Sequence, residues 1–228
     1  MKALKLIGVL LDYPADGLWA HRDELLAATD DPALSPRRRA QLAQFVRDLF
    51  DLEPMLAQER WLGLFDRGRS MSLLLFEHIH GESRDRGQAM VDLVETYRTH
   101  GFELASRELP DYLPLVLEYL SLRPATEVHD WLDHVGHILE LLAARAAERE
   151  SPYGLLFELL VEIGRGKVDL GLLRERTARE PRDDTPEAMD RVWEEEAVRF
   201  GADAPADDCQ PPRRLPDGVV PAEPRVMP

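Results

Sequence analysis

Residues 126–142 read TEVHDWLDHVGHILELL. Apolar residues recur there at intervals of three and four, which is the spacing of one face of a helix. The stretch therefore predicts a long amphipathic helix that faces a core. The apolar positions are Val128, Trp131, Leu132, Val135, Ile138, Leu139 and Leu142.

The composition also favours helices. The chain has 37 leucines, four isoleucines and only 7% aromatic residues, and unbranched side chains lose little rotamer freedom in a helix. No stretch alternates as a strand would, so we expect an all-α fold, a single bundle of about nine to eleven helices. Further helices are predicted over 3–11, 17–28, 36–49, 54–65, 71–80, 84–99, 111–122, 152–163 and 186–200.

Three helix starts are predicted from a hydroxyl residue followed by proline. The hydroxyl caps the first turn, and proline is tolerated at the first helical position because its missing N–H has no partner there. The three pairs are Ser35-Pro36, Ser151-Pro152 and Thr185-Pro186.

Charge and cysteine content limit the function classes. The formal charge is −15, which repels phosphate backbones and anionic membranes but attracts basic protein segments. The single cysteine, Cys209, excludes an intramolecular disulfide and any multi-cysteine metal site. The apolar run Leu6–Leu11 is too short to span a membrane, so we expect a cytoplasmic protein with no direct membrane insertion and no nucleic-acid partner.

The last 28 residues differ in composition from the rest. They hold seven of the 17 prolines and almost no apolar periodicity. We therefore predict a helical domain over 1–200 and a disordered, proline-rich acidic tail over 201–228.

The most distinctive stretch runs from Leu64 to Leu93 and mixes apolar residues with dense charge: LFDRGRSMSLLLFEHIHGESRDRGQAMVDL. A helix over 71–80 would be apolar on two sides, with Gly81 ending it and Ser83 capping the next helix. The charged residues form either an ordinary ion-paired corner or, through Glu77, His80 and Glu82, a carboxylate surface for a basic ligand.

A second informative stretch is RELPDYLPLVLEYL, residues 107–120. Asp111 is expected to cap a helix that carries Pro114 in its first turn. Glu108, Asp111 and Glu118 together with the tyrosines could hold an amphipathic peptide.

Two alternatives from other classes remain open. His134, His137 and Glu140 are spaced so that one helix could aim them at a metal ion, although a solvated histidine face explains the same spacing. The chain could also be a structural subunit of a membrane redox complex. The sequence carries no phosphate loop and no nucleophile motif, so we do not expect an enzyme.

The stretches 64–93 and 107–120, followed by RDDTPEAMDRVWEEEAVRF at 182–200, resemble the NarJ family, the nitrate reductase delta subunit. The resemblance covers residues 3–200. It implies a TorD-like, all-helical chaperone that binds the N-terminal basic amphipathic segment of the apo catalytic (alpha) subunit of respiratory nitrate reductase.

The resemblance also implies that the protein assists insertion of the molybdenum cofactor, bis-molybdopterin guanine dinucleotide, into its client before membrane docking. No cofactor would then be bound stably, and molybdenum cofactor biosynthesis proteins are further expected partners. We predict that the client segment binds as a helix between Leu73–His80 and Pro110–Glu118. The expected contacts are Asp66, Arg69, Phe76, Glu77, His80, Glu82, Arg86, Glu108, Asp111, Tyr112 and Glu118.

Overall fold

A computed structural model of the chain describes residues 1–81, 83–104, 108–166 and 171–191. The chain divides into two units, residues 1–189 and residues 190–228, and the first holds all the named helices. The predicted tail from Gly201 lies outside the described residues, so its disorder and the boundary at residue 200 stay predictions.

The described part of the first unit is all-helical, as predicted, and its only extended pairing is an isolated bridge between Leu74 and Tyr112. Its eleven α-helices agree with the predicted range. They are α1 (Lys2–Leu11), α2 (Arg22–Ala28), α3 (Pro36–Phe50), α4 (Pro54–Phe65), α5 (Leu75–His80), α6 (Asp85–Thr99), α7 (Leu113–Ser121), α8 (Ala125–His134), α9 (Gly136–Glu148), α10 (Gly154–Ile163) and α11 (Gly171–Thr177). Two 3-10 helices, η1 (Asp16–His21) and η2 (Arg69–Met71), join them, and a further helical turn starts at Pro186.

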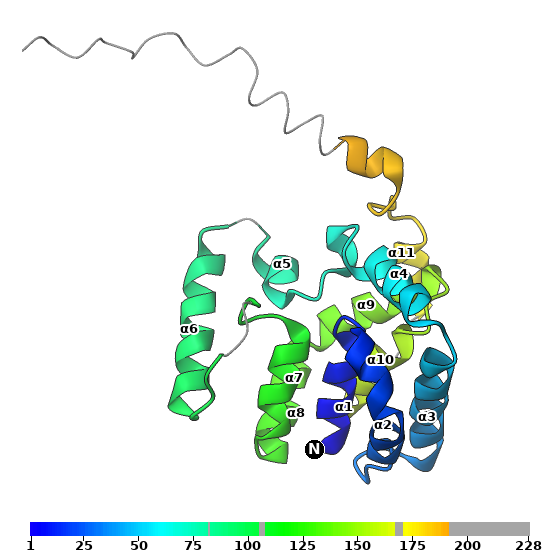
Figure 1. Ribbon diagram of the computed structural model, residues 1–228. Coiled ribbons are helices and arrows are strands. Elements are labelled where there is room, and N and C mark those ends of the chain that lie inside the picture. The colour runs from blue at the N-terminus through cyan, green and yellow to red at the C-terminus, as the bar shows by residue number, and fades with distance from the viewer. Residues whose placement is uncertain (82, 105–107, 167–170, 192–228) are drawn as a thin grey trace, which may run out of the picture. The chain divides into compact units, whose positions relative to one another are not determined.

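Helix α1 lies in the middle of the bundle in Figure 1, where it packs along α7 and also contacts α10. Seven of its ten residues are buried, because both neighbours cover it. Gly8 permits the close approach to α7: a Cβ atom at this position would lie 3.1 Å from the carbonyl oxygen of Pro114. A larger residue would therefore push α1 and α7 apart.

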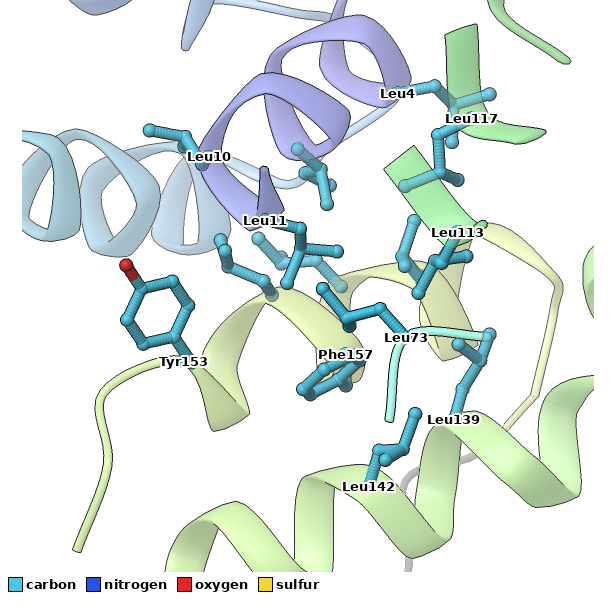
Figure 2. Close-up of a cluster of buried hydrophobic side chains, with 14 of the residues drawn as sticks. Leu4, Leu10, Leu11, Leu73, Leu113, Leu117, Leu139, Leu142, Tyr153 and Phe157 are labelled. Atoms are coloured by element: carbon cyan, nitrogen blue, oxygen red, sulfur yellow. The ribbon is translucent and has the colours of Figure 1, made fainter. Parts of the chain in front are cut away.

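Leucine side chains from several helices fill the space around α1. Figure 2 shows Leu4 and Leu11 of α1 beside Leu113 and Leu117 of α7, with Phe157 of α10 below them. These five side chains are completely buried, and burial of each contributes about 1.5–3 kcal/mol of transfer free energy. This shared apolar centre is what holds the bundle together.

Two of the three predicted helix starts are confirmed. The Ser35 hydroxyl accepts a hydrogen bond from the backbone N–H of Arg38 at 3.3 Å, and the Thr185 hydroxyl accepts one from Ala188 at 3.2 Å. The third prediction was wrong in position, because α10 begins only at Gly154 and Ser151 precedes it in a turn.

The helix predicted over 71–80 was wrong in its first half. Residues 72–74 are not helical, and α5 begins at Leu75. The carbonyl oxygen of Leu73 accepts a hydrogen bond from Leu113 at 2.8 Å, so this backbone pairs with a distant segment instead of with its own next turn. Pairing across the fold overrides the local helical pattern here.

The long helix predicted over 126–142 is two helices. Helix α8 ends at His134 and α9 begins at Gly136, and glycine is a poor helix former that favours such a break.

The short helix α11 was not predicted. Ser83 does not cap α6 as predicted, because Arg84 occupies the cap position and its side chain makes no capping hydrogen bond. Gly81 does end α5 with a positive φ of 54°, as expected of a glycine there.

Candidate functional site

The three segments that carry the family resemblance meet around residues 68–76. Asp111 of the second segment bonds to Phe76 of the first, and Asp183 of the third bonds to Ser70. Segments far apart in the sequence thus join on one short stretch of chain between η2 and α5.

The first junction is a backbone pairing at the base of α5. The N–H of Leu75 donates to the carbonyl oxygen of Asp111 at 3.1 Å, and the N–H of Leu113 donates to the carbonyl oxygen of Leu73 at 2.8 Å. The two segments are therefore in direct contact here. A client helix cannot lie between them along 73–76 and 111–113, which corrects the predicted location of the groove.

Asp111 is buried, with no exposed surface. Its Oδ2 atom accepts a hydrogen bond from the Phe76 N–H at 2.9 Å, and its Oδ1 atom has no hydrogen-bond partner. Burial raises the pKa of this carboxyl group. Asp111 therefore caps α5 and not α7, and its side chain is inaccessible to a client in this structure.

The other predicted residues of α5 and α6 lie close together at the surface. Glu77 forms an ion pair with Arg86 at 3.3 Å, and both side chains are less than one quarter exposed. The rings of Phe76 and His80 meet edge to face with centroids 5.6 Å apart. Because Arg86 partly neutralises Glu77, this carboxylate is a weaker attractor of basic ligands than the sequence suggested.

The neighbouring His78 is turned inward. Its Nε2 atom lies 2.8 Å from the carbonyl oxygen of Ser72, to which an Nε2–H donates. Burial lowers the pKa of His78, so the neutral imidazole is favoured in this position. His78 thereby ties α5 to the extended stretch before it.

Four of the residues predicted to contact the client are exposed and lie at separate places along the chain. Asp66, Arg69, Glu108 and Glu118 all lie at the surface. Tyr112 is half-buried, and its hydroxyl donates to Asp12 at 2.9 Å. Glu82 lies outside the described residues.

The residues from Leu74 to Tyr112 leave the bundle and return to it; we call their described part the arm. It comprises α5, α6 and the loops that follow them (Figure 1). Only Tyr97 is fully buried in α6, and its hydroxyl donates to Pro110 at 2.8 Å. Ile79, Val91 and Leu109 are exposed by 47%, 61% and 39%, so the arm presents apolar side chains to solvent.

The second junction is an ion-pair network that the sequence did not reveal. The Asp183 carboxylate accepts hydrogen bonds from the Ser70 N–H at 2.7 Å, from the Ser70 hydroxyl at 2.6 Å and from Arg149 at 3.2 Å. Arg145 donates to the Ser70 carbonyl oxygen at 2.8 Å. Gly68 is required beside it, because a Cβ atom there would lie 2.6 Å from the Asp183 carboxyl carbon.

Asp184 extends the network. It accepts from Arg182 at 2.9 and 2.6 Å and lies 3.5 Å from Arg149. The hydrogen bonds from Arg182 lower the pKa of Asp184 to about 2. Two features of the sequence mark this network: the acidic pair Asp183–Asp184 before the helix start at Thr185, and Gly68 in the loop after Phe65. Neither feature indicates which residues it contacts.

Comparison with known proteins decides the family. Residues 31–153 match the model of the nitrate reductase delta subunit family. The chain belongs to this family. It is 50% identical over 204 residues to the nitrate reductase molybdenum cofactor assembly chaperone NarJ of Escherichia coli strain K12, covering 89% of this chain and 86% of that protein.

Two further relatives carry similar names. The probable nitrate reductase molybdenum cofactor assembly chaperone NarW of the same strain is 43% identical over 97% of this chain and 95% of its own length. The probable NarJ of Bacillus subtilis strain 168 is 26% identical over 68% of this chain and 84% of its own length. As a nitrate reductase delta subunit family member, the chain is an assembly chaperone and not an enzyme.

The structure does not align the residues of the metal alternative on one helix. His134 ends α8 and His137 lies in α9 after the break, so the single helix that would have aligned them does not exist. The His134 Nδ1 atom instead lies against the carbonyl oxygen of Asp130. Across the described residues, no three His, Cys, Asp or Glu side chains gather as a metal site would require, and no helix there is long and apolar enough to cross a membrane.

Proposed function

We propose that this protein is the dedicated cytoplasmic chaperone of a respiratory nitrate reductase. It binds the N-terminal basic amphipathic segment of the apo catalytic subunit and assists insertion of the molybdenum cofactor, bis-molybdopterin guanine dinucleotide, before the subunit docks at the membrane. Molybdenum cofactor biosynthesis proteins are proposed as its second class of partner. The observation that carries the proposal is 50% identity over most of both chains with a protein named for this role.

We place the client segment on the outer surface of the arm and the adjoining face of α7. Phe76 and His80 contribute a half-buried aromatic pair, and Ile79 is an exposed apolar side chain between them in sequence. Glu108 and Glu118 are exposed carboxylates before and on α7. An amphipathic helix binds by its apolar face, while rim carboxylates set its orientation and association rate.

Support for this surface comes from its construction. The base of the arm is fixed by the bond from Phe76 to Asp111 and by the pairing of Leu74 with Tyr112. Above that base, α6 buries only one residue completely. A firmly anchored element with exposed apolar side chains suits a binding role better than a purely structural one.

The test is calorimetric titration with a synthetic peptide of about fifteen residues, the length of one groove-bound helix, from the N-terminus of the catalytic subunit. The double variant Glu108→Gln, Glu118→Gln should bind about two- to tenfold more weakly and lose part of its salt dependence. The control pair Asp23→Asn, Glu175→Gln removes two exposed carboxylates from α2 and α11. Equal affinity and salt slope for both double variants would exclude this surface.

A further inference from the structure

A cavity of about 440 Å³ lies between α3, α4 and the turn that joins α9 to α10. Its walls are mainly apolar, and Phe45 and Leu49 of α3 and Leu64 of α4 are buried side chains that line it. Binding pockets for small molecules have volumes of about 300–1,000 Å³ and mostly apolar walls. The cavity therefore has the size and the lining of a small-molecule site. None of the described residues that line it belongs to the arm.

Tyr153, directly before α10, lines this cavity and is only 4% exposed. Its ring is held edge to face by Phe45 and by Phe65, with ring centroids 5.3 and 5.1 Å apart. Figure 2 shows its hydroxyl oxygen pointing away from Phe157 of the core. Among the described residues, this hydroxyl has no hydrogen-bond partner. Buried polar groups are nearly always hydrogen-bonded, so the hydroxyl is available to a bound molecule.

Arg149 brings a second unpaired donor to the same cavity. Its side chain is 10% exposed and lines the cavity. Its Nε atom has no hydrogen-bond partner in the part of the chain that the structure describes, and the Oδ2 atom of Asp184 lies 3.5 Å from it. An arginine N–H can only donate. Burial raises the pKa of Tyr153, so the tyrosine hydroxyl keeps its proton and can donate it. A molecule that satisfies both groups therefore carries a hydrogen-bond acceptor.

The charges that line the cavity cancel one another. Three arginines and three carboxylates line it, namely Arg60, Arg149, Arg182, Asp48, Glu150 and Asp184. Arg149 is paired with Asp183 and Asp184, and Arg182 is paired with Asp184. A charged ligand would gain no net attraction from such a lining, and it would lose its hydration on entering the apolar space. The lining therefore favours an uncharged molecule.

We propose that this cavity binds a small, uncharged aromatic molecule whose carbonyl-type acceptor receives a hydrogen bond from the Tyr153 hydroxyl. Aromatic molecules favour edge-to-face and offset contacts with aromatic side chains, and the rings of Phe45 and Tyr153 line the cavity. The Nε–H of Arg149 offers the acceptor a second hydrogen bond. The site is distinct from the client surface on the arm, and the proposal does not rest on the proposed function.

The test is fluorescence titration of the full-length chain with Prodan, an uncharged naphthalene that carries a carbonyl acceptor and emits at shorter wavelength when it leaves water. We expect saturable one-to-one binding with this shift in emission. Gly63→Leu should weaken the binding at least about tenfold, because Gly63 lines the cavity and a leucine side chain would occupy part of it. The matched control is Gly136→Leu, which lies outside the cavity. A Cβ atom at either glycine meets no atom within 4 Å, so both variants should fold.

The variant Tyr153→Phe isolates the hydroxyl group. Its melting temperature should be unchanged or higher, because the hydroxyl that it removes has no partner among the described residues. Displacement of Prodan by two competitors of similar shape then measures the hydrogen bond, since acetylnaphthalene carries the acceptor and ethylnaphthalene lacks it. Tyr153→Phe should weaken the binding of acetylnaphthalene about three- to tenfold, the effect of one hydrogen bond, and leave that of ethylnaphthalene unchanged.

Several results would overturn the proposal. They are the absence of saturable Prodan binding, equal binding to the two leucine variants, and an equal loss for both competitors in Tyr153→Phe. Tighter binding of the anion naphthoate than of acetylnaphthalene would contradict an uncharged ligand. Competition between the client peptide and Prodan would also overturn the proposal, by showing that the cavity is part of the client site.

Discussion

Gly68 and Asp183 provide the sharpest test of how the family segments are joined. Asp183→Ala removes two hydrogen bonds to Ser70 and one to Arg149. A hydrogen bond to a charged group contributes about 1.5–3 kcal/mol. The Asp183 side chain is 34% exposed, so water replaces part of the loss, and we expect the free energy of unfolding to fall by about 2–4 kcal/mol.

Gly68→Ala should have nearly the same effect for a steric reason. Its φ and ψ of −151° and 156° are accessible to alanine, so the backbone is not strained. The added Cβ atom would lie 2.6 Å from the Asp183 carboxyl carbon and would displace the carboxylate from Ser70. The expected loss is again about 2–4 kcal/mol.

The two substitutions together should therefore cost little more than either one. Urea unfolding followed by circular dichroism measures all four proteins of the cycle, with the denaturant slope expected to stay unchanged. Each single variant should lower the melting temperature by about 4–16 °C for a chain of this size. Additivity of the two losses to within about 0.5 kcal/mol would refute the reasoning, because it would mean that Gly68 and Asp183 do not compete for one space.

Three further outcomes are expected. Asp111→Asn should keep the cap on α5, whereas Asp111→Ala should lower the free energy of unfolding by about 1–2 kcal/mol, because it leaves the Phe76 N–H unpaired. Because burial raises the pKa of Asp111 in the folded chain, the contribution of this group to stability falls as pH rises through that pKa. Chemical denaturation between pH 4 and 8 should show this fall for the unsubstituted chain and not for the Asn variant. Glu150→Gly should raise the melting temperature, because Glu150 has a φ of 51° and a left-handed backbone costs a non-glycine residue about 1–2 kcal/mol. An unchanged or lower melting temperature of the glycine variant in calorimetry would count against that strain. Truncation after Phe200 should leave the melting temperature and client-peptide affinity unchanged, and a drop of more than about 5 °C would show that the predicted tail contributes to the fold.

Local signals in the sequence were sufficient for the helical class and for most helix boundaries. The spacing of three and four in apolar residues identified α3, because one face of this helix is buried, with Leu42, Phe45, Val46 and Leu49 on it. Ser35 and Thr185 marked helix starts correctly, since a capping hydroxyl acts within its own turn. The three family stretches were also recognisable from their residues alone.

The candidate site could be predicted only in part. Phe76 and His80 lie together on α5 because residues four apart share a helix face, whereas the ion pair of Glu77 with Arg86 joins α5 to α6. Asp111 was misplaced because its capping partner, Phe76, is 35 positions away. The residues around an aspartate that caps a distant helix can look the same as those around an aspartate that caps the helix directly after it.

The sequence by itself determined the helical class, the acidic charge and the family of this protein, since these depend on composition, short-range periodicity and motifs. Only the tertiary structure decided that residues 72–74 leave the helix to pair with 111–113, and that Asp183 occupies the space beside Gly68. The physical reason is that each of these features is a contact between segments more than thirty positions apart. Their free energy depends on packing across the core, and no local pattern in either segment records it.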